Sequence, residues 1–222
     1  MNIRKIQVET TQKPYWITIG QNILREMAEY IPSDITGSKL CIVTDQNVAR
    51  YHLFYVMKAA EAAGFCLTEP VIIPAGEAGK SLAAAQEVVE QLSARGLDRR
   101  SVVMALGGGV VGDVAGFAAS VFMRGIPYIQ VPTTLLAQAD SSIGGKTGVN
   151  TTAGKNLIGT FYQPVTVLMD IALLDTLDER EFRSGYAEIV KVALVKDADF
   201  FSWLEKNDVL ERAPSVVTEA IH

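Results

Sequence analysis

Short, almost entirely apolar runs alternate along this chain with segments of helical spacing, and this alternation limits the possible folds more than any other feature. The runs are "KLCIVTD", "SVVMAL", "PYIQV" and "PVTVLMD". Strands without a polar face are typical of parallel sheets that are covered on both sides. The helical segments between them supply the crossovers that parallel strands require. We therefore predict an α/β fold with a mostly parallel sheet.

The two ends of the chain depart from this alternation. At the start, "RKIQVE" and "YWITIG" flank a turn-like "TTQKP", which predicts a β-hairpin. From Asp178 onward the sequence is helix-like, without a strand signal. We place a boundary near residue 177, giving an α/β domain at 1–177 and the start of an all-α domain at 178–222. The final "PSVVTEAIH" is typical of the first turns of a helix, so we expect the sequence to belong to a longer protein.

Composition and charge indicate a cytoplasmic protein that binds neither nucleic acid nor membranes. The formal net charge is −5, and no dense cluster of Lys and Arg is present. The apolar segment 102–122 contains Asp113 and five glycines, which are costly in lipid. The N-terminus lacks the apolar core of a signal peptide. Cys41 and Cys66 lie in apolar segments and are expected in the core, not in a disulfide or metal pair.

A glycine pattern in "LGGGVVGD" marks the first candidate site. Gly107, Gly109 and Gly112 fit G-x-G-x-x-G between a strand and a helix, where backbone N–H groups bind phosphate. A tight strand-to-helix turn is the alternative. A dinucleotide fingerprint of the common type would place an acid roughly 20 residues downstream, and none is found there. Asp45 and Asn47 end an upstream strand instead, so they are candidates for the adenosine end of a nucleotide.

The segment "PAGEAGKS" is the second candidate site. It contains G-K-S but has Pro74 where a P-loop requires glycine, which excludes a P-loop. Glu77 and Lys80 nevertheless follow a strand at the edge where α/β sheets bind ligands. They are candidates for contacts to ribose or phosphate, and a solvated turn remains the alternative.

The third candidate is the polar stretch "PTTLLAQADSSIGGKTGVN" with the "GKNLIGTF" that follows. Thr133 and Thr134 end a predicted strand, and Asp140 and Lys146 come next. Hydroxyl, amide and ammonium groups on a glycine-rich loop suit a small polyoxygenated anion. A mobile loop is the alternative. Apolar residues are interleaved through the stretch and predict a packed segment; they are Leu135, Leu136, Ile143, Val149, Leu157 and Ile158.

"GYAEIVKVALVKD" holds the fourth candidate. Glu188 and Lys191 are three residues apart and share one face of a predicted helix. An ordinary ion pair is the simplest interpretation. A metal-binding role for Glu188 is the alternative, although no His or Cys lies nearby to complete a site. His52 lies in an apolar helix and is expected to be structural.

Together, these motifs resemble the 3-dehydroquinate synthase family of the shikimate pathway. The matching segments are "GGGVVGDVAGFAAS", "MRGI", "QVPTTLLAQADSSIGGKTGVN", "GKNLIGTFYQP" and "SGYAEIVK", in family order. The resemblance extends from about Asp45 to Lys191 and is densest from Gly107 onward. It implies an NAD-binding α/β domain followed by a helical, metal-binding domain, in a homodimer.

The resemblance also implies a reaction. The substrate would be the sugar phosphate 3-deoxy-D-arabino-heptulosonate 7-phosphate, and the products 3-dehydroquinate and phosphate. NAD would oxidise the C5 hydroxyl, which acidifies the C6 proton for phosphate elimination, and would then return the hydride. A divalent metal, zinc or cobalt, would bind the C4 and C5 oxygens and stabilise developing alkoxide.

Individual positions match the family's functional residues. The cofactor contacts would be Asp45, Asn47, Glu77, Lys80, Gly109, Val110, Val111, Gly112, Asp113, Thr133, Thr134, Lys146 and Lys155. Asp140, Lys146, Asn156 and Lys191 would act on the substrate, and Arg124 would reach the substrate phosphate from the partner subunit. Arg124 could also simply be a cation at a helix C-terminus. Glu188 would be a metal ligand.

One departure from the family bears on activity. The family's other two metal ligands are histidines that match no residue of this sequence, so we expect the chain alone to be inactive. A related sugar-phosphate cyclase such as 2-deoxy-scyllo-inosose synthase remains an alternative. So does an NAD-binding and dimerising module without activity. The "DSSIGGKTGVN" and "GKNLIGTFYQP" segments argue against a polyol dehydrogenase of similar architecture.

Overall fold

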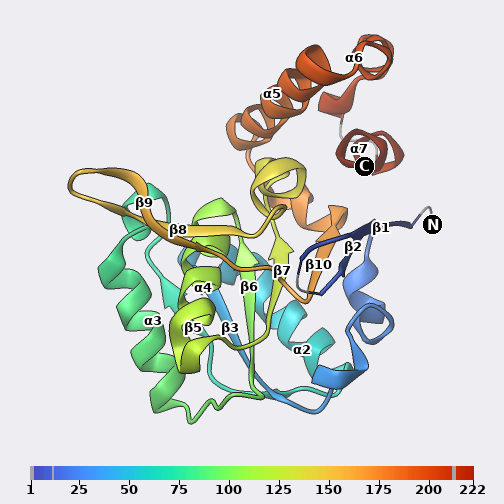
Figure 1. Ribbon diagram of the computed structural model, residues 1–222. Helices are drawn as coiled ribbons and strands as arrows, with labels where there is room; N and C mark the ends of the chain where they lie inside the picture. Colours follow the sequence, from blue (N-terminus) through green and yellow to red (C-terminus); the bar gives the residue numbers. More distant parts are fainter. Residues whose placement is uncertain (1–2, 12, 212–213) are drawn as a thin grey trace.

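The computed structural model describes residues 3–11, 13–211 and 214–222, and a twisted sheet lies at its centre (Figure 1). The strand order is β1–β2–β10–β7–β6–β3–β4, and β5 also pairs with β3. β1 and β2 form an antiparallel hairpin, and the other described pairings in this sheet are parallel. The strands are β1 (Arg4–Val8), β2 (Tyr15–Gly20), β3 (Lys39–Asp45), β4 (Cys66–Leu67), β5 (Val71–Ile73), β6 (Val102–Gly107), β7 (Tyr128–Pro132) and β10 (Thr166–Asp170). The predicted α/β fold and opening hairpin are confirmed.

Two helices cover one face of the sheet over β3, β5 and β6. They are α3 (Leu82–Ala94) and α4 (Gly109–Val121), which share an apolar core with these strands. The Ser81 hydroxyl accepts the Ala84 N–H at 3.1 Å and begins α3. Gly96, with φ of +67°, follows the end of α3. Ser81 and Gly96 therefore mark the two ends of α3.

The opposite face is covered by η1 (Ile23–Glu29) and by a continuous helical run. That run consists of α1 (Gln46–Val48), the π-helical turn η3 (Ala49–Leu53) and α2 (Phe54–Ala62). His52 is buried, and its Nε2 lies 2.7 Å from Thr176 Oγ1, which fits a structural role. η1 is a 3₁₀ helix that contains a non-helical Glu26. The remaining short turns are η2 (Ser33–Ile35), η4 (Glu77–Gly79), η5 (Phe122–Arg124), η6 (Ala137–Ser141) and η7 (Ile171–Thr176).

A fully buried carboxylate joins β10 to the chain that leaves β2. Asp170 accepts the N–H groups of Asn22 at 2.7 Å and Leu24 at 3.1 Å. It also accepts the Ala172 N–H at 3.1 Å. Burial raises the pKa of the Asp170 carboxyl, and the backbone donors oppose that shift. The start of the chain is therefore fastened to a strand that lies about 150 residues later.

A second, two-stranded sheet projects beside α4 as a long hairpin (Figure 1). It consists of β8 (Lys146–Thr151) and β9 (Gly154–Phe161), which are antiparallel. Gly116 allows β8 to approach α4, because a Cβ there would lie 2.6 Å from the Thr147 methyl group. The hairpin was predicted only as a packed polar segment. For the apolar residues of the whole polar stretch, that prediction is right for Leu135 and Val149, which are fully buried, and wrong for Leu136 and Leu157, which are exposed.

Helices follow η7 and lie above the sheet near β2 and β10 (Figure 1). They are α5 (Glu179–Lys196), α6 (Ala198–Leu204), η8 (Val209–Glu211) and α7 (Pro214–Ile221). Phe182, Ile189 and Val217 share an apolar core with Ile17 and Val167 of the sheet. The predicted helical character after residue 177 is observed. The domain boundary at that position remains a prediction.

The two cysteines differ in environment. Cys41 is buried in β3, as expected, whereas Cys66 is exposed on the short edge strand β4, so its predicted core position is wrong. Among the described residues, none of the helices has the length and apolar character that a membrane crossing requires.

Candidate active site

The predicted ligand edge of the sheet is formed by the turn between β6 and α4. Gly107 ends β6, and α4 begins at Gly109. The absence of side chains lets neighbouring elements approach the turn closely. A Cβ on Gly109 would lie 2.9 Å from Ser141 Oγ, and one on Gly112 would lie 2.8 Å from Gln130 Oε1. These glycines therefore have a packing role in addition to any contact with phosphate.

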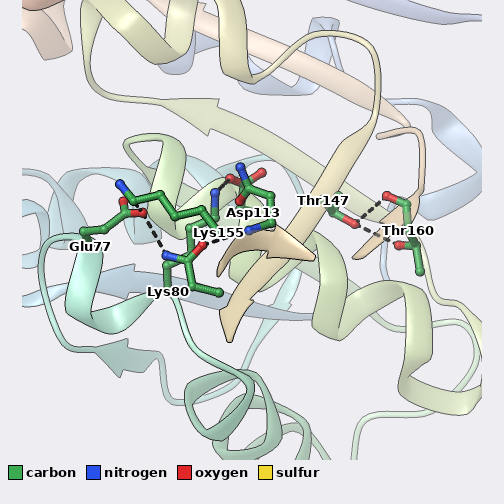
Figure 2. Close-up of polar contacts among 8 residues, drawn as sticks. Glu77, Lys80, Asp113, Thr147, Lys155 and Thr160 are labelled. Carbon is green, nitrogen blue, oxygen red and sulfur yellow. Dashed lines mark hydrogen bonds and ion pairs between the residues drawn. The ribbon is translucent and has the colours of Figure 1, made fainter. Parts of the chain in front are cut away.

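A buried ion pair lies behind this turn. Lys80 Nζ is 2.5 Å from Asp113 Oδ2, and the two side chains are 10% and 17% exposed (Figure 2). Burial raises the pKa of the Asp113 carboxyl, and the hydrogen bond from Lys80 opposes that rise. The "PAGEAGKS" turn is thus bound to the second turn of α4, and the alternative of a merely solvated turn does not hold for Lys80.

The far end of the β8–β9 hairpin contacts the same turn. Glu77 accepts a hydrogen bond from Asn150 Nδ2 at 2.8 Å and lies 3.3 Å from Lys155 Nζ (Figure 2). The hydrogen bond from Asn150 is the main reason that the pKa of Glu77 is lowered, and Lys155 contributes. The Asn150 N–H also donates to the Lys80 carbonyl at 2.9 Å. Two predicted cofactor segments are therefore joined.

A pocket of about 430 Å³ opens between α4, η6 and the hairpin. Its lining brings together four predicted site residues, which are Asp113, Asp140, Lys146 and Asn156. A larger cavity of about 810 Å³ lies at the opposite, amino edge of the sheet, where its lining includes Tyr15, Pro127 and Thr166. Ligands of parallel α/β sheets bind at the carboxyl edge, so the smaller pocket is the candidate site.

The position of Asp140 depends on a buried amide. Gln138 Nε2 donates to the carbonyl oxygens of Pro132 at 3.1 Å and Asp170 at 3.2 Å. These bonds fasten η6 to the ends of β7 and β10. Asp140, in the same turn, is exposed at the pocket.

Helix α5 reaches this region through a close backbone contact. A Cβ on Gly185 would lie 2.5 Å from the Leu136 nitrogen, so only glycine fits there without displacement. Glu188 follows about one turn after Gly185 and accepts a hydrogen bond from Lys191. This bond raises the pKa of the Lys191 ammonium, and the nearby negative charge of Asp140 acts in the same direction. The predicted i,i+3 pair is therefore present and lies within electrostatic range of Asp140.

Three hydroxyl groups around the α4 turn have distinct environments. The Oγ atoms of Thr133 and Ser141 are buried and have no hydrogen-bond partner among the described residues. The Thr134 hydroxyl accepts the Ala137 N–H at 3.1 Å and so helps to begin η6. Buried hydroxyls usually have partners, so the first two are suited to polar groups of a ligand. Together with the cradle around Gly109, they fit a dinucleotide at this turn.

Two predicted residues, Asp45 and Arg124, are not among the residues that line the pocket. Asp45 Oδ1 accepts the N–H groups of Asn47 at 2.8 Å and Val48 at 3.0 Å, so this carboxylate caps its own helix. Both bonds use Oδ1, and a ribose contact would use Oδ2. Arg124 lies beyond the far end of α4, about 20 Å along the helix from Gly109 at 1.5 Å per residue. Within one chain Arg124 does not join the pocket.

A metal centre is not assembled by the described part of the chain. No group of three or more His, Cys, Asp or Glu side chains in residues 3–11, 13–211 and 214–222 could hold a metal ion. Glu188 is a single candidate ligand whose carboxylate is engaged by Lys191. These residues alone do not fit a metal site.

Comparison with known proteins identifies the family. A family profile described as 3-dehydroquinate synthase N-terminal matches residues 70–184, which include the α4 turn, the hairpin and the start of α5. The 3-dehydroquinate synthase of Acidithiobacillus ferrooxidans is 48% identical over 224 residues, covering 99% of this chain and 60% of the relative. This chain belongs to the 3-dehydroquinate synthase family. It spans between 53% and 60% of the length of two such curated relatives.

Solved structures of related cyclases have the same fold as this 3-dehydroquinate synthase family member. ValA, a 2-epi-5-epi-valiolone synthase from Streptomyces hygroscopicus with NAD⁺ and Zn²⁺ bound, is 33% identical with a TM-score of 0.85, over 96% of this chain and 60% of that one. A 2-deoxy-scyllo-inosose synthase complexed with carbaglucose-6-phosphate, NAD⁺ and Co²⁺ is 32% identical with a TM-score of 0.79. That match covers 85% of this chain and 51% of the synthase chain.

In this family member, sequence reasoning missed two features beside the site. Asn150 was not singled out, although it contacts Glu77, Lys80 and Asn156. A chain of hydroxyls was also missed. Thr147 Oγ1 lies 2.8 Å from Thr160 Oγ1 (Figure 2), which in turn lies 2.9 Å from Ser120 Oγ. The sequence signal for a hairpin was available in two neighbouring segments, "KTGVNT" and "GKNLIGTF", which are separated by a short turn.

Proposed function

We propose that this chain is the NAD-binding and substrate-orienting part of a 3-dehydroquinate synthase. The whole protein would convert 3-deoxy-D-arabino-heptulosonate 7-phosphate to 3-dehydroquinate and phosphate. The observation that carries the proposal is the pocket at the α4 turn, where Asp140, Lys146 and Asn156 converge beside a dinucleotide-type glycine turn. Membership of the family supports the same activity.

NAD would be held by the α4 turn and its surroundings. The first N–H groups of α4 would donate to the pyrophosphate, and Thr133 and Ser141 would supply hydroxyls. When bound, NAD supplies reversible hydride acceptance, which transiently oxidises a substrate hydroxyl. Lys80 is already neutralised by Asp113, so it would orient the cofactor through that pair without adding net charge.

Asp140, Lys146 and Asn156 would bind the substrate's polar groups at the pocket. Lys146 and Asn156 are exposed on the hairpin and can donate hydrogen bonds to hydroxyl or phosphate oxygens. Lys191 would approach from α5, where the charge of Asp140 already favours its ammonium form. This arrangement would hold an anionic sugar acid against the α4 turn.

We propose the remaining partners on the same basis. Glu188 would be one ligand of a zinc or cobalt ion whose other ligands match no residue of this chain. The protein would act as a cytoplasmic homodimer, in which Arg124 reaches the partner's substrate. Two measurements on the protein at its full encoded length test this separately, each comparing wild type with Arg124→Ala. Sedimentation should show that the variant stays dimeric, and a phosphate-release assay should show that it loses turnover.

A second candidate function is a related cyclase acting on another sugar phosphate. The similarity to 2-deoxy-scyllo-inosose synthase and to ValA favours this alternative, because both share the fold at above 30% identity. A higher identity of 48% to a curated 3-dehydroquinate synthase favours the leading proposal.

Two measurements test the proposal. Calorimetric titration of this chain with NAD is expected to show saturable binding, and the absence of binding would overturn the cofactor assignment. Phosphate release by the protein at its full encoded length, with NAD and cobalt or zinc, is expected with the heptulosonate phosphate. It is not expected with glucose 6-phosphate, and the reverse preference would favour the alternative cyclase.

A further inference from the structure

Asn150 occupies an irregular position in the hairpin and joins three segments of the candidate site. The register of β8 and β9 shifts between Val149 and Thr151, so Asn150 lies at a bulge. Bulges redirect side chains and are frequent beside functional sites. Here the backbone of Asn150 pairs with the segment at Lys80 and Ser81 instead of continuing the hairpin ladder.

The side chain of Asn150 uses both ends of its amide. Nδ2 donates to Glu77 Oε1 at 2.8 Å, and Oδ1 accepts the Asn156 N–H at 3.0 Å. Asn156 has φ of +56°, a left-handed conformation that residues other than glycine adopt only when neighbouring contacts favour it. The amide of Asn150 is such a contact, and it holds Asn156 at the rim of the pocket.

We infer that Asn150 is a positioning residue that sets the relative placement of the cofactor turn and the substrate-facing end of the hairpin. This inference rests on the proposed function, because it concerns the same site. Asn150 contacts Glu77 and Lys80 of the cofactor turn and Asn156 of the hairpin. Lys155 adds a second link between the two segments through its own ion pair with Glu77. One amide therefore couples two segments that are more than 70 residues apart in sequence.

The chemistry at Asn150 requires one donor and one acceptor. Asn150→Asp keeps the acceptor for the Asn156 N–H but sets a second carboxylate against Glu77. We expect this variant to weaken NAD binding by about tenfold or more, because the hydrogen bond becomes a like-charge contact. Glu77→Gln in the same chain restores a donor, so that the Gln amide can donate to the Asp carboxylate.

The decisive measurement is the coupling between these two substitutions. The NAD affinity of the Glu77→Gln variant is the reference for this comparison, because it already includes the loss of any direct contact between Glu77 and the cofactor. In that background, adding Asn150→Asp is expected to change the affinity by less than about threefold. A merely structural asparagine would show the same loss in both backgrounds, and that result would overturn the inference.

A second measurement needs no ligand. In Asn150→Ala, amide hydrogen exchange at Asn156 is expected to accelerate by about tenfold or more, because its N–H loses its acceptor. Thr151→Ala is the matched control on the same hairpin. Its hydroxyl makes local turn contacts, accepting from the Ala153 N–H and donating to the Gly154 carbonyl, so exchange at Asn156 should stay near wild type.

The outcomes separate this inference from the proposed function. Failure of the wild-type chain to bind NAD would overturn the proposed function, while the exchange data would still decide whether Asn150 holds Asn156. Normal NAD binding by the wild type, with unchanged affinity in Asn150→Asp or unchanged exchange in Asn150→Ala, would overturn the inference alone.

Discussion

Two lysine–carboxylate pairs in this molecule have opposite surroundings. Lys80 and Asp113 are largely buried between the α4 turn and the segment that precedes α3. On α5, by contrast, Lys191 is 61% exposed beside a partly exposed Glu188, and the neighbouring Leu194 and Val195 are also exposed. On the cofactor side of the site, the charged groups are held in place by contacts within this chain. On the α5 side, the Lys191 ammonium and its neighbours are largely open to solvent.

The comparison predicts very different costs for removing each lysine. Lys80→Ala leaves Asp113 buried without its partner and is expected to destabilise the chain by about 3–5 kcal/mol. Lys191→Ala removes a solvent-exposed pair and should cost far less stability than Lys80→Ala. Urea unfolding of both variants at neutral pH measures the difference, and similar losses would show that the two pairs are not distinct.

Adding a single carbon atom to Gly185 is enough to disturb the contact between α5 and the residues just before η6. Gly185→Ala places a Cβ against backbone at Leu136 and is expected to cost about 1–3 kcal/mol through overpacking. NAD affinity should change little, because the α4 turn lies elsewhere. Thermal unfolding and NAD titration of this variant would check the separation, and a large loss of NAD affinity would contradict it.

Two substitutions at Asp45 distinguish its role as a helix cap from its proposed role in cofactor binding. Asp45→Ala removes the cap and a candidate ribose acceptor, so NAD binding should weaken by about 1–3 kcal/mol. Asp45→Asn keeps a capping oxygen and serves as the control for stability. Calorimetry on the two variants measures the binding effect, and wild-type affinity in Asp45→Ala would place the adenosine elsewhere.

The smallest effect concerns the pH dependence of stability at Glu77. Its folded pKa is lowered from 4.5, chiefly by the hydrogen bond from Asn150, so its ionised form stabilises the fold above 4.5. That contribution is lost as pH falls through the lower folded pKa. Because Glu77 is exposed, the effect should be small. Unfolding of wild type and Glu77→Gln, compared at about pH 6 and about pH 3, should differ more at the higher pH. An equal difference at both values would rule out this contribution.

Much of the fold was predictable because burial on both faces leaves a clear mark on β3, β6, β7 and β10. The hairpin was not, because β9 is largely exposed and its glycines and threonines carry a weak strand signal. The candidate site was predictable where residues follow strand ends, as at Asp113 and Asp140. Asn150 could not be found in this way, because its importance comes from a bulge and from partners distant in sequence. Cys66 was misplaced because edge strands expose residues that an apolar run predicts as buried.

The bond between β2 and β10 has a consequence for how the chain reaches this fold. β2 pairs with β10, and the segment after β2 donates to Asp170, so the first hairpin finds its place only after residue 170 has been made. Pairings that close such long loops are slow to form and leave early strands exposed in the meantime. On a ribosome, β3 to β7 can assemble first, and the amino-terminal hairpin then docks on their edge with β10. The β1–β2 hairpin, although made before β3 to β10, would thus be among the last of these elements to fold.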